Sequence, residues 1–172
     1  MWLTNLSGHI EKYKKGATSP SEVISHGVTD PVGIALDHTG NIYVSNGVSK
    51  HPANVEVYAP GSDLPTRTIT DGVTSPVGIT VDAKGTLYVT NVDQNNVEEY
   101  LAGQSHPYQT ITKGMNYPDA VTVNKKGRLY VGNFGNGFIV EFAPGSLMPL
   151  KDEIHRRLRT PQGLAYYPPL LP

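Results

Sequence analysis

The most constraining feature of this 172-residue sequence is a segment that occurs three times almost intact. The copies read DPVGIALDHTGNIYVSN at 30–46, SPVGITVDAKGTLYVTN at 75–91 and YPDAVTVNKKGRLYVGN at 117–133. The first half returns at 160–166, and the second half opens the chain at 1–5. The shared prolines at 31, 76, 118 and 161 are 45, 42 and 43 residues apart. A repeat of roughly 40–50 residues is typical of propeller blades, so the chain is predicted to be a repeat array.

The repeat predicts strands rather than helices. Each copy holds several short runs of β-type residues between clusters of Gly, Pro, Asn and Asp, and no stretch keeps a helical apolar period. In the first run Ile34 and Leu36 alternate with Gly33 and Ala35, and the other copies keep one bulky and one small face. Sheets stacked around an axis can bury the bulky face of one sheet against the small face of the next. We therefore expect an all-β propeller of four-stranded antiparallel blades.

Turn residues connect the runs. An Asp or Asn followed three residues later by Gly separates the first and second runs, at 37–40, 82–85 and 124–127. Because such a side chain bonds its own turn and Gly accepts a positive φ, each of these segments predicts a hairpin. The third runs, at 10–13, 55–58, 97–100 and 139–142, start with an aliphatic and end with an aromatic residue. Their carboxylates are expected to face solvent; these are Glu11, Glu56, Glu98, Glu99 and Glu141.

The two ends of the chain match in phase. The chain begins at a second strand and ends after a first strand, so residues 161–166 are predicted to pair with residues 2–5 in one shared blade. This pairing would give about four blades and would remove two exposed strand edges, which favour aggregation. We expect a single domain over 1–172, with repeats at roughly 1–27, 28–71, 72–114, 115–159 and 160–168 and a tail at 169–172.

Composition excludes several classes of function. The formal net charge is −1 and the densest basic cluster, at 156–159, is short, so we expect no nucleic-acid partner. Without cysteine the chain can form neither a disulfide nor a thiolate site. No apolar run reaches membrane-spanning length, and residues 1–10 lack the pattern of a signal peptide, so we expect no membrane insertion.

A ring of asparagines is the first candidate site. In a propeller, the loops that join second to third strands share one face with the loops that join successive blades. This channel face would collect Asn5, Asn46, Asn91 and Asn133, with Asp30 beside them. Asparagine carbonyls can bind a hard cation or a polyol, so these five residues are candidate ligand-binding residues. The alternative is that each Asn closes its own turn or satisfies neighbouring backbone.

Histidines give a second, weaker candidate site. His9, His26 and His51 fall in loops of the channel face, and three convergent imidazoles could hold zinc and activate a bound water. They occur at unrelated positions within the loops, so the sequence does not imply that they converge. No Ser-His-Asp motif occurs in a nucleophile-elbow context, and we assign no catalytic residue.

The repeat unit resembles a known family. The pattern Pro-x-Gly-Ile-x-x-Asp-x-x-Gly-x-Ile/Leu-Tyr-Val-x-Asn, followed by Val/Ile-x-x-Tyr/Phe-Ala-Pro-Gly-Ser, is similar to NHL-type β-propeller repeats, above all those of bacterial envelope or secreted proteins. The resemblance implies an extracellular or envelope location. Relatives usually have about six blades, which leaves open a four-bladed ring, half of an eight-bladed homodimer or a fragment of a larger propeller. The same group includes gluconolactonase-like hydrolases and streptogramin lyases, so the resemblance leaves enzyme and binder open.

Our leading hypothesis is a non-catalytic propeller without a cofactor that presents its channel face to a protein or glycan partner. Variable loops on a repeated scaffold are suited to binding, and here they are residues 47–54, 92–96 and 134–137. The first alternative is a hydrolase or lyase that uses a divalent metal at the channel mouth. The second is a structural repeat fragment of a larger propeller.

Overall fold

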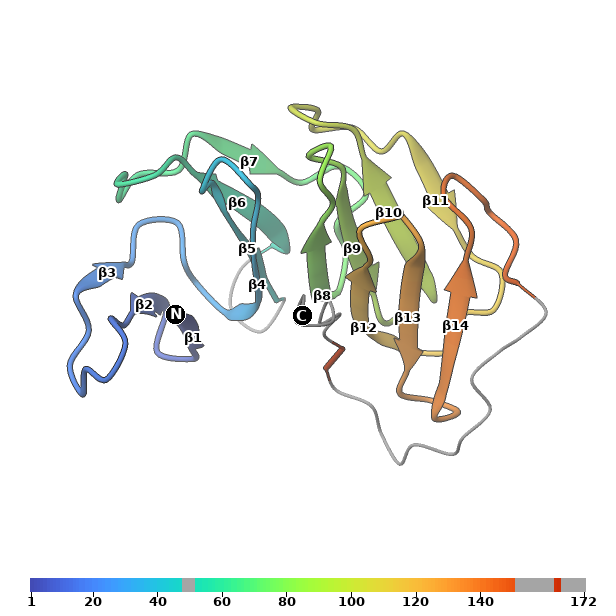
Figure 1. Ribbon diagram of the computed structural model, residues 1–172, viewed down its shortest axis with the longest axis horizontal. Helices are drawn as coiled ribbons and strands as arrows, with labels where there is room; N and C mark the ends of the chain where they lie inside the picture. Colours follow the sequence, from blue (N-terminus) through green and yellow to red (C-terminus); the bar gives the residue numbers. More distant parts are fainter. Residues whose placement is uncertain (48–51, 151–162, 165–172) are drawn as a thin grey trace, which may run out of the picture.

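The computed structural model describes residues 1–47, 52–150 and 163–164, and Figure 1 shows them as an all-β chain. The described strands form four antiparallel sheets, which we call blades 1 to 4 in chain order. No helix that could span a membrane occurs in this part of the chain. Each sheet runs in sequence order from an inner to an outer strand, as a propeller blade does, so the predicted fold class is confirmed.

The strand bounds follow the repeat closely. Blade 1 holds β1 (Trp2–Asn5), β2 (His9–Lys12) and β3 (Glu22–Ile24). Blade 2 holds β4 (Pro31–Leu36), β5 (Ile42–Asn46), β6 (Asn54–Tyr58) and β7 (Arg67–Ile69). Blade 3 holds β8 (Pro76–Val81), β9 (Leu87–Asn91), β10 (Asn96–Tyr100) and β11 (Gln109–Ile111). Blade 4 holds β12 (Pro118–Val123), β13 (Leu129–Asn133) and β14 (Phe138–Phe142). An isolated bridge between Phe142 and Pro149 stands where its fourth strand would begin.

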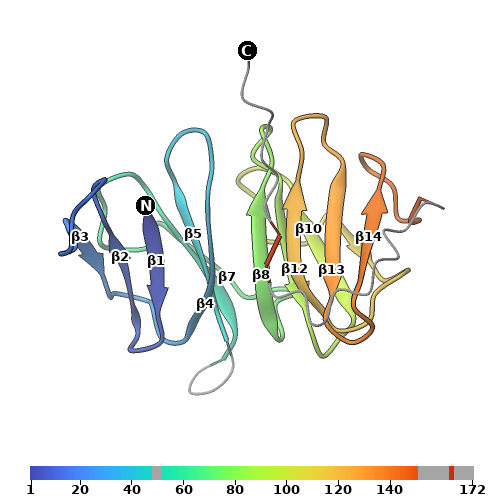
Figure 2. The same cartoon turned by 60° about the horizontal axis from the view of Figure 1, so that its bottom comes forward.

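The blades follow one another as a fan, with blade 1 and blade 4 at its two ends (Figures 1 and 2). The innermost strands β4, β8 and β12 lie side by side, since β8 contacts both of the others. Blade 1 has no innermost strand among the described residues, because its sheet begins with β1. The predicted pairing of residues 161–166 with β1 falls mostly outside the described residues and stays a prediction, as do the domain and repeat bounds.

The predicted hairpins between first and second strands are confirmed. In blade 2, Asp37 Oδ1 accepts the backbone N–H groups of Thr39 at 2.9 Å and Asn41 at 3.0 Å, and Gly40 has a φ of 90°. Although burial raises the pKa of Asp37, the hydrogen bonds from Thr39 and Asn41 outweigh it and lower the pKa to about 2. Asp82 and Asn124 bond their own turns in the same way.

Blades 2 and 3, and blades 3 and 4, meet through a small face on one blade and a bulky face on the next. We call the side of a blade that faces the following blade its leading face, and the other side its trailing face. On the leading face, a Cβ added at Gly33 would lie 2.5 Å from the Val77 carbonyl, and one added at Gly78 would lie 2.5 Å from the Asp119 carbonyl. Glycine is therefore required there for close approach of the inner strands. Three apolar clusters fill the three junctions between blades.

The expectation that the glutamates of the third strands face solvent is wrong for three of them. Glu56, Glu98 and Glu99 are buried, whereas Glu11 and Glu141 are half-buried. The alternation along these strands does not reveal the burial of Glu56 and Glu98, because the preceding blade covers the trailing faces of blades 2 and 3. Glu56 and Glu98 thus lie inside the junctions between blades rather than on the surface.

We expect Gly78→Ala to lower the free energy of unfolding by about 2–3 kcal/mol, because its Cβ would overlap the Asp119 carbonyl. Urea unfolding followed by tryptophan fluorescence and circular dichroism measures the change. Gly61→Ala is the matched control: its Cβ meets nothing within 4 Å, and only its positive φ of 76° is strained, for about 1 kcal/mol. Equal losses in the two variants would contradict the role of close approach.

Candidate functional site

Three asparagines of the ring, Asn46, Asn91 and Asn133, are buried, and their side chains form hydrogen bonds with backbone groups. Asn46 and Asn91 have no solvent exposure, and each side chain makes four hydrogen bonds. Asn91 Oδ1 accepts the N–H groups of Thr74 at 2.9 Å and Ser75 at 3.3 Å, and its Nδ2 donates to the Gly72 carbonyl at 2.8 Å. These partners belong to the loop that joins blades 2 and 3. One amide therefore holds each loop between blades against the sheet.

Blades 1 and 4 keep parts of this arrangement. Asn133 is buried, accepts the Asn116 N–H at 2.9 Å and donates to the Gly114 carbonyl at 2.8 Å. Asn5 is half-buried, and its side-chain oxygen accepts the N–H of Ser7 at 3.0 Å. The Asp30 carbonyl accepts the Gly47 N–H at 2.8 Å beside the ring. The geometry shows a structural use for these amides, and a ligand on the ring stays a prediction.

A polar relay with a buried glutamate extends from the ring in blades 2 and 3. In blade 3, Asn91 Nδ2 donates to Asn96 Oδ1 at 2.9 Å, and Asn96 Nδ2 donates to Glu98 Oε1 at 2.9 Å. The Thr110 hydroxyl donates to the other Glu98 oxygen at 2.7 Å. Burial raises the pKa of Glu98, the hydrogen bond from Thr110 lowers it, and the net direction is upward. Blade 2 repeats this relay with Asn46, Asn54, Glu56 and Thr68.

The histidines lie apart from one another in the described residues. His9 lies within β2 rather than in a loop, with Nε2 3.1 Å from Glu11 Oε1, and His26 Nδ1 is 3.8 Å from Asp63 Oδ2. His51 falls outside the described residues. In residues 1–47, 52–150 and 163–164, no group of three His, Cys, Asp or Glu side chains could hold a metal ion.

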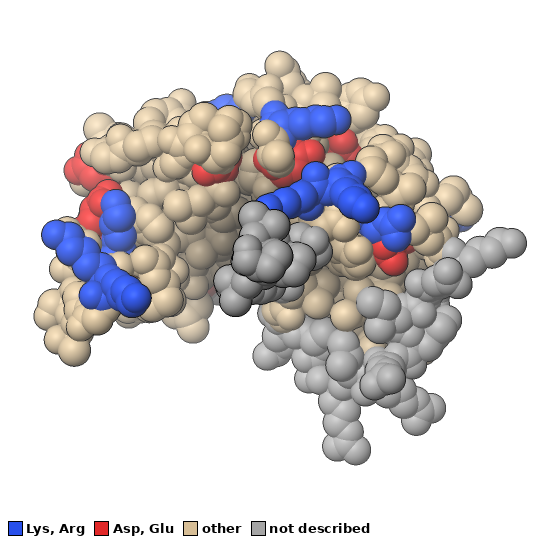
Figure 3. Space-filling view, in the orientation of Figure 1, with Lys and Arg blue, Asp and Glu red and all other residues tan. Residues whose placement is uncertain are grey.

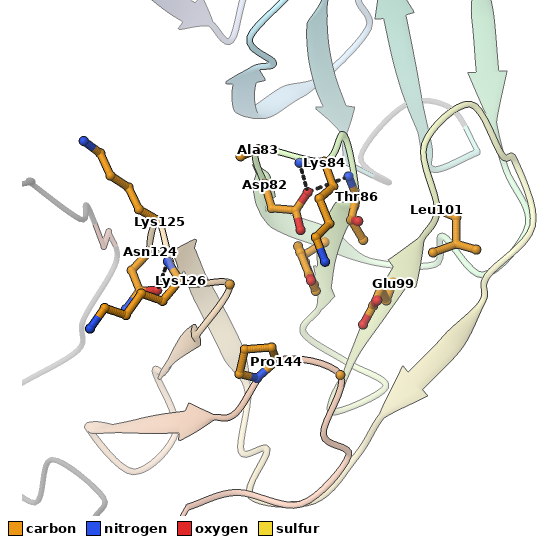
Figure 4. A pocket seen from close by; sticks show the side chains of 13 residues that line it. Asp82, Ala83, Lys84, Thr86, Glu99, Leu101, Asn124, Lys125, Lys126 and Pro144 are labelled. Carbon is orange, nitrogen blue, oxygen red and sulfur yellow. Dashed lines mark hydrogen bonds between the residues drawn. The ribbon is translucent and has the colours of Figure 1, made fainter.

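A polar pocket opens on the face opposite the channel face, between blades 3 and 4. It has a volume of about 420 Å³ and combines two carboxylates with three lysines (Figure 4). Figure 3 shows basic side chains on either side of a band of acidic ones at this end of the molecule. Lining residues that carry charge are Asp82, Lys84, Glu99, Lys125 and Lys126.

Burial sets the electrostatics of this pocket. It raises the pKa of Glu99, the hydrogen bond from Gln109 lowers it, and the nearby Asp82 charge raises it further. Burial also raises the pKa of Tyr88, and the charges of Glu99 and Asp82 add to this effect. A similar pocket of about 440 Å³ between blades 2 and 3 has Val57 in the place of Glu99. Sequence reasoning missed this site. The signal that could have found it is Glu99, the second glutamate of the third run in blade 3.

The channel face carries an aromatic patch, which consists of Tyr117 and Phe134. Tyr117 is 50% exposed and Phe134 42%, and the Phe134 N–H donates to the Tyr117 carbonyl at 2.9 Å. The Tyr117 N–H donates to Asn95 Oδ1 at 2.6 Å. Both Tyr117 and Asn95 have a φ of 51°, which is a strained conformation for a bulky residue such as tyrosine.

This strain is a local departure from the repeat. At the same position in blades 2 and 3, the N–H groups of Asp30 and Ser75 donate to the ring amides Asn46 and Asn91. In blade 4 the backbone of Tyr117 turns away and uses Asn95 instead. Phe134 lies in the loop at 134–137, and Asn95, which holds Tyr117, lies in the loop at 92–96; the sequence predicts both to be variable binding loops.

A small channel cavity of about 220 Å³ lies between the innermost strands, where Asp119 stands beside Val32, Val77 and Leu164. Burial raises the pKa of the Asp119 carboxyl. Sequence reasoning missed Asp119 too, although its charge is unique among the residues that follow the repeated prolines in the copies at 30–46, 75–91 and 117–133.

Comparisons with known proteins support the fold. No protein-family model matches the chain, and no curated protein sequence matches it. Among solved structures, the chain is similar to the hydrazine synthase of Kuenenia stuttgartiensis, with a TM-score of 0.66 and 19% sequence identity. The match covers 88% of this chain and 42% of the other, so the chain spans less than half of the length of this neighbour. At this identity the likeness shows a shared β-propeller fold alone, and NHL membership and the location stay predictions.

We expect Asn91→Ala to lower the free energy of unfolding by at least about 3 kcal/mol. It leaves the N–H groups of Thr74 and Ser75 and the Gly72 carbonyl without this partner, and each unsatisfied buried group costs about 1–3 kcal/mol. Urea unfolding gives the loss. Asn5→Ala, which removes one hydrogen bond at a half-buried site, should cost less than about 1 kcal/mol. A mild Asn91→Ala would show that the loops are held by other contacts.

Glu98→Gln should stabilise the protein at neutral pH. Because the folded pKa of Glu98 lies above its unfolded value, its favourable contribution is complete below the unfolded pKa and is lost as pH rises through the folded pKa. The gain of the variant should therefore grow from pH 4 to pH 8, as measured by urea unfolding at each pH. The control Glu22→Gln, at an ion pair with Lys12 on an outer strand, should stay within about 0.5 kcal/mol throughout. A gain for Glu98→Gln that is independent of pH would contradict this account.

Proposed function

We propose that this protein is a non-catalytic β-propeller scaffold that binds a glycan on its channel face, with Tyr117 and Phe134 as the binding platform. The observation that carries the proposal is the strained, exposed Tyr117, which leaves the repeat pattern and is fixed by Asn95 at 2.6 Å. Strained backbone persists only where surrounding structure holds it, and it clusters at binding and active sites.

The chemistry of the patch fits a sugar. The C–H face of a pyranose packs against an aromatic ring, and sugar hydroxyls both donate and accept hydrogen bonds. Tyr and Phe supply large contact areas at low entropic cost, and amide side chains supply a donor and an acceptor each. Exposed amides stand in the loops of the two rings and in the loop of Asn95, which bonds Tyr117; they are Asn116, Asn136 and Gln94.

The blade framework supports rigid presentation of the patch. The Asn116 N–H donates to the buried Asn133 Oδ1 at 2.9 Å, and the Gly135 N–H donates to the Asn116 carbonyl at 3.1 Å. Loops that are held in place before binding lose less conformational entropy when a ligand arrives. An envelope or extracellular location, which the repeat resemblance implies, would bring such a face within reach of cell-surface glycans.

An array of bacterial and plant oligosaccharides, followed by isothermal titration calorimetry of each hit, tests the proposal. Tyr117→Ala and Phe134→Ala should each weaken binding by about tenfold or more, since an aromatic contact of this kind contributes roughly 0.5–1.5 kcal/mol beyond its buried area. Tyr108→Ala removes an exposed ring from the opposite face and should leave the affinity unchanged.

Two outcomes would overturn the proposal. The first is an absence of binding to every oligosaccharide at millimolar concentration. The second is glycan binding that neither channel-face variant weakens. Binding of a protein partner that depends on Tyr117 would show that the patch binds a protein, which is the other partner that the sequence predicts.

A further inference from the structure

The polar pocket between blades 3 and 4 contains a buried carboxylate that the described part of the chain leaves without a cation. Glu99 is 7% exposed, and Gln109 Nε2 donates to its Oε2 at 2.6 Å. No Lys, Arg or His within residues 1–47, 52–150 and 163–164 forms an ion pair with it. Tyr88, which pairs with Glu99 across β9 and β10, is 6% exposed, and its hydroxyl has no hydrogen bond to a described residue. The pocket thus offers an unpaired carboxylate and an unbonded hydroxyl to a ligand.

Blade 4 shows which group completes such a carboxylate. Glu141 stands in blade 4 where Glu99 stands in blade 3, because each pairs with the repeated tyrosine of the second strand. The Arg128 guanidinium donates to Glu141 Oε1. Thr86 takes the place of Arg128 in blade 3, since each donates its backbone N–H to the turn residue four positions before it. Blade 3 therefore keeps the carboxylate of this pair and lacks the guanidinium.

Three exposed lysines line the same pocket. Figure 4 shows Lys84 and Glu99 on one side of it and Lys125 and Lys126 on the other. None of these lysines forms an ion pair with a residue that the structure describes. Negative charge is thus buried in the pocket, and positive charge lies at its exposed edge. A ligand that pairs with both needs a cation at its inner end and an anion at its outer end.

We propose that this pocket binds a small guanidino acid, a zwitterion with a guanidinium at one end and a carboxylate at the other. The guanidinium pairs with Glu99 as Arg128 pairs with Glu141, because its planar donors match a carboxylate. The carboxylate of the ligand meets the lysines at the edge of the pocket. The volume of about 420 Å³ lies within the range of small-molecule sites, which is roughly 300–1,000 Å³. This inference is independent of the glycan site, which lies on the opposite face.

Isothermal titration calorimetry of the full chain with 4-guanidinobutyrate tests the proposal. This probe carries one guanidinium and one carboxylate and should bind at a single site. Propylguanidine and butyrate are the matched control ligands, since each keeps one of the two charged groups. Each should bind at least about tenfold more weakly than 4-guanidinobutyrate, because each leaves one set of charges in the pocket unpaired.

Variants of the two equivalent positions locate the site. Glu99→Gln keeps the shape of the side chain and removes its charge, so it should weaken binding of 4-guanidinobutyrate by at least about tenfold. Thr86→Arg supplies the guanidinium from the chain itself, as blade 4 does, and should weaken binding to a similar extent. Glu141→Gln, at the equivalent position of blade 4 and outside the pocket, is the control and should leave the affinity unchanged. Circular dichroism and thermal melts check that all variants are folded.

The lysines give a result that differs in sign between two ligands. A variant in which Lys84, Lys125 and Lys126 are all replaced by Gln should bind 4-guanidinobutyrate more weakly and propylguanidine at least as tightly as the wild type, because it loses only positive charge.

Three outcomes would overturn the proposal. The first is an absence of 4-guanidinobutyrate binding at roughly 10 mM ligand. The second is butyrate binding as tight as that of 4-guanidinobutyrate, which would show an anion site made by the lysines alone. The third is binding that Glu99→Gln leaves unchanged, which would place the ligand elsewhere on the molecule.

Discussion

The close approach of neighbouring inner strands is the contact on which the rest of the structure depends. A Cβ at Gly33 or Gly78 would lie 2.5 Å from a backbone carbonyl of the next blade, so glycine sets the spacing of the sheets. With that spacing fixed, the bulky residues of one blade fill the junction and the loops between blades fall within reach of the buried asparagines. Ala120 occupies the same position in blade 4.

Departures from the repeat locate the candidate sites better than the repeat itself. The ring of asparagines is the most regular polar feature, and its amides bind the loops of the fold. Tyr117, Glu99 and Asp119 each break the pattern, and each lies on a pocket, a channel or an exposed patch. A residue that serves packing is needed in every blade, whereas a residue that serves a ligand is needed once. This difference explains why the strongest sequence signal led to structural residues.

Buried carboxylates show how the blades can differ in stability while sharing a fold. Glu56 and Glu98 are each bonded by an asparagine and a threonine, yet burial keeps their pKa values raised, so their ionised forms oppose folding. Blade 4 has Val140 in this position, and blade 1 has Glu11, which His9 and Tyr13 bond. The relay is thus complete in the two central blades and altered at both ends of the fan.

The sequence by itself determined the fold class, the four blades, the hairpins at 37–40, 82–85 and 124–127, and the small and bulky faces of the inner strands. These follow from local rules, since strand period, turn residues and repeat length need no knowledge of distant partners. Only the tertiary structure decided that Glu56, Glu98 and Glu99 are buried, that the asparagine amides are occupied, and that Tyr117 is strained beside Asn95. Each of these depends on what the neighbouring blade or loop places against the residue. A strand pattern shows which face a side chain takes, but it does not show whether another sheet covers that face.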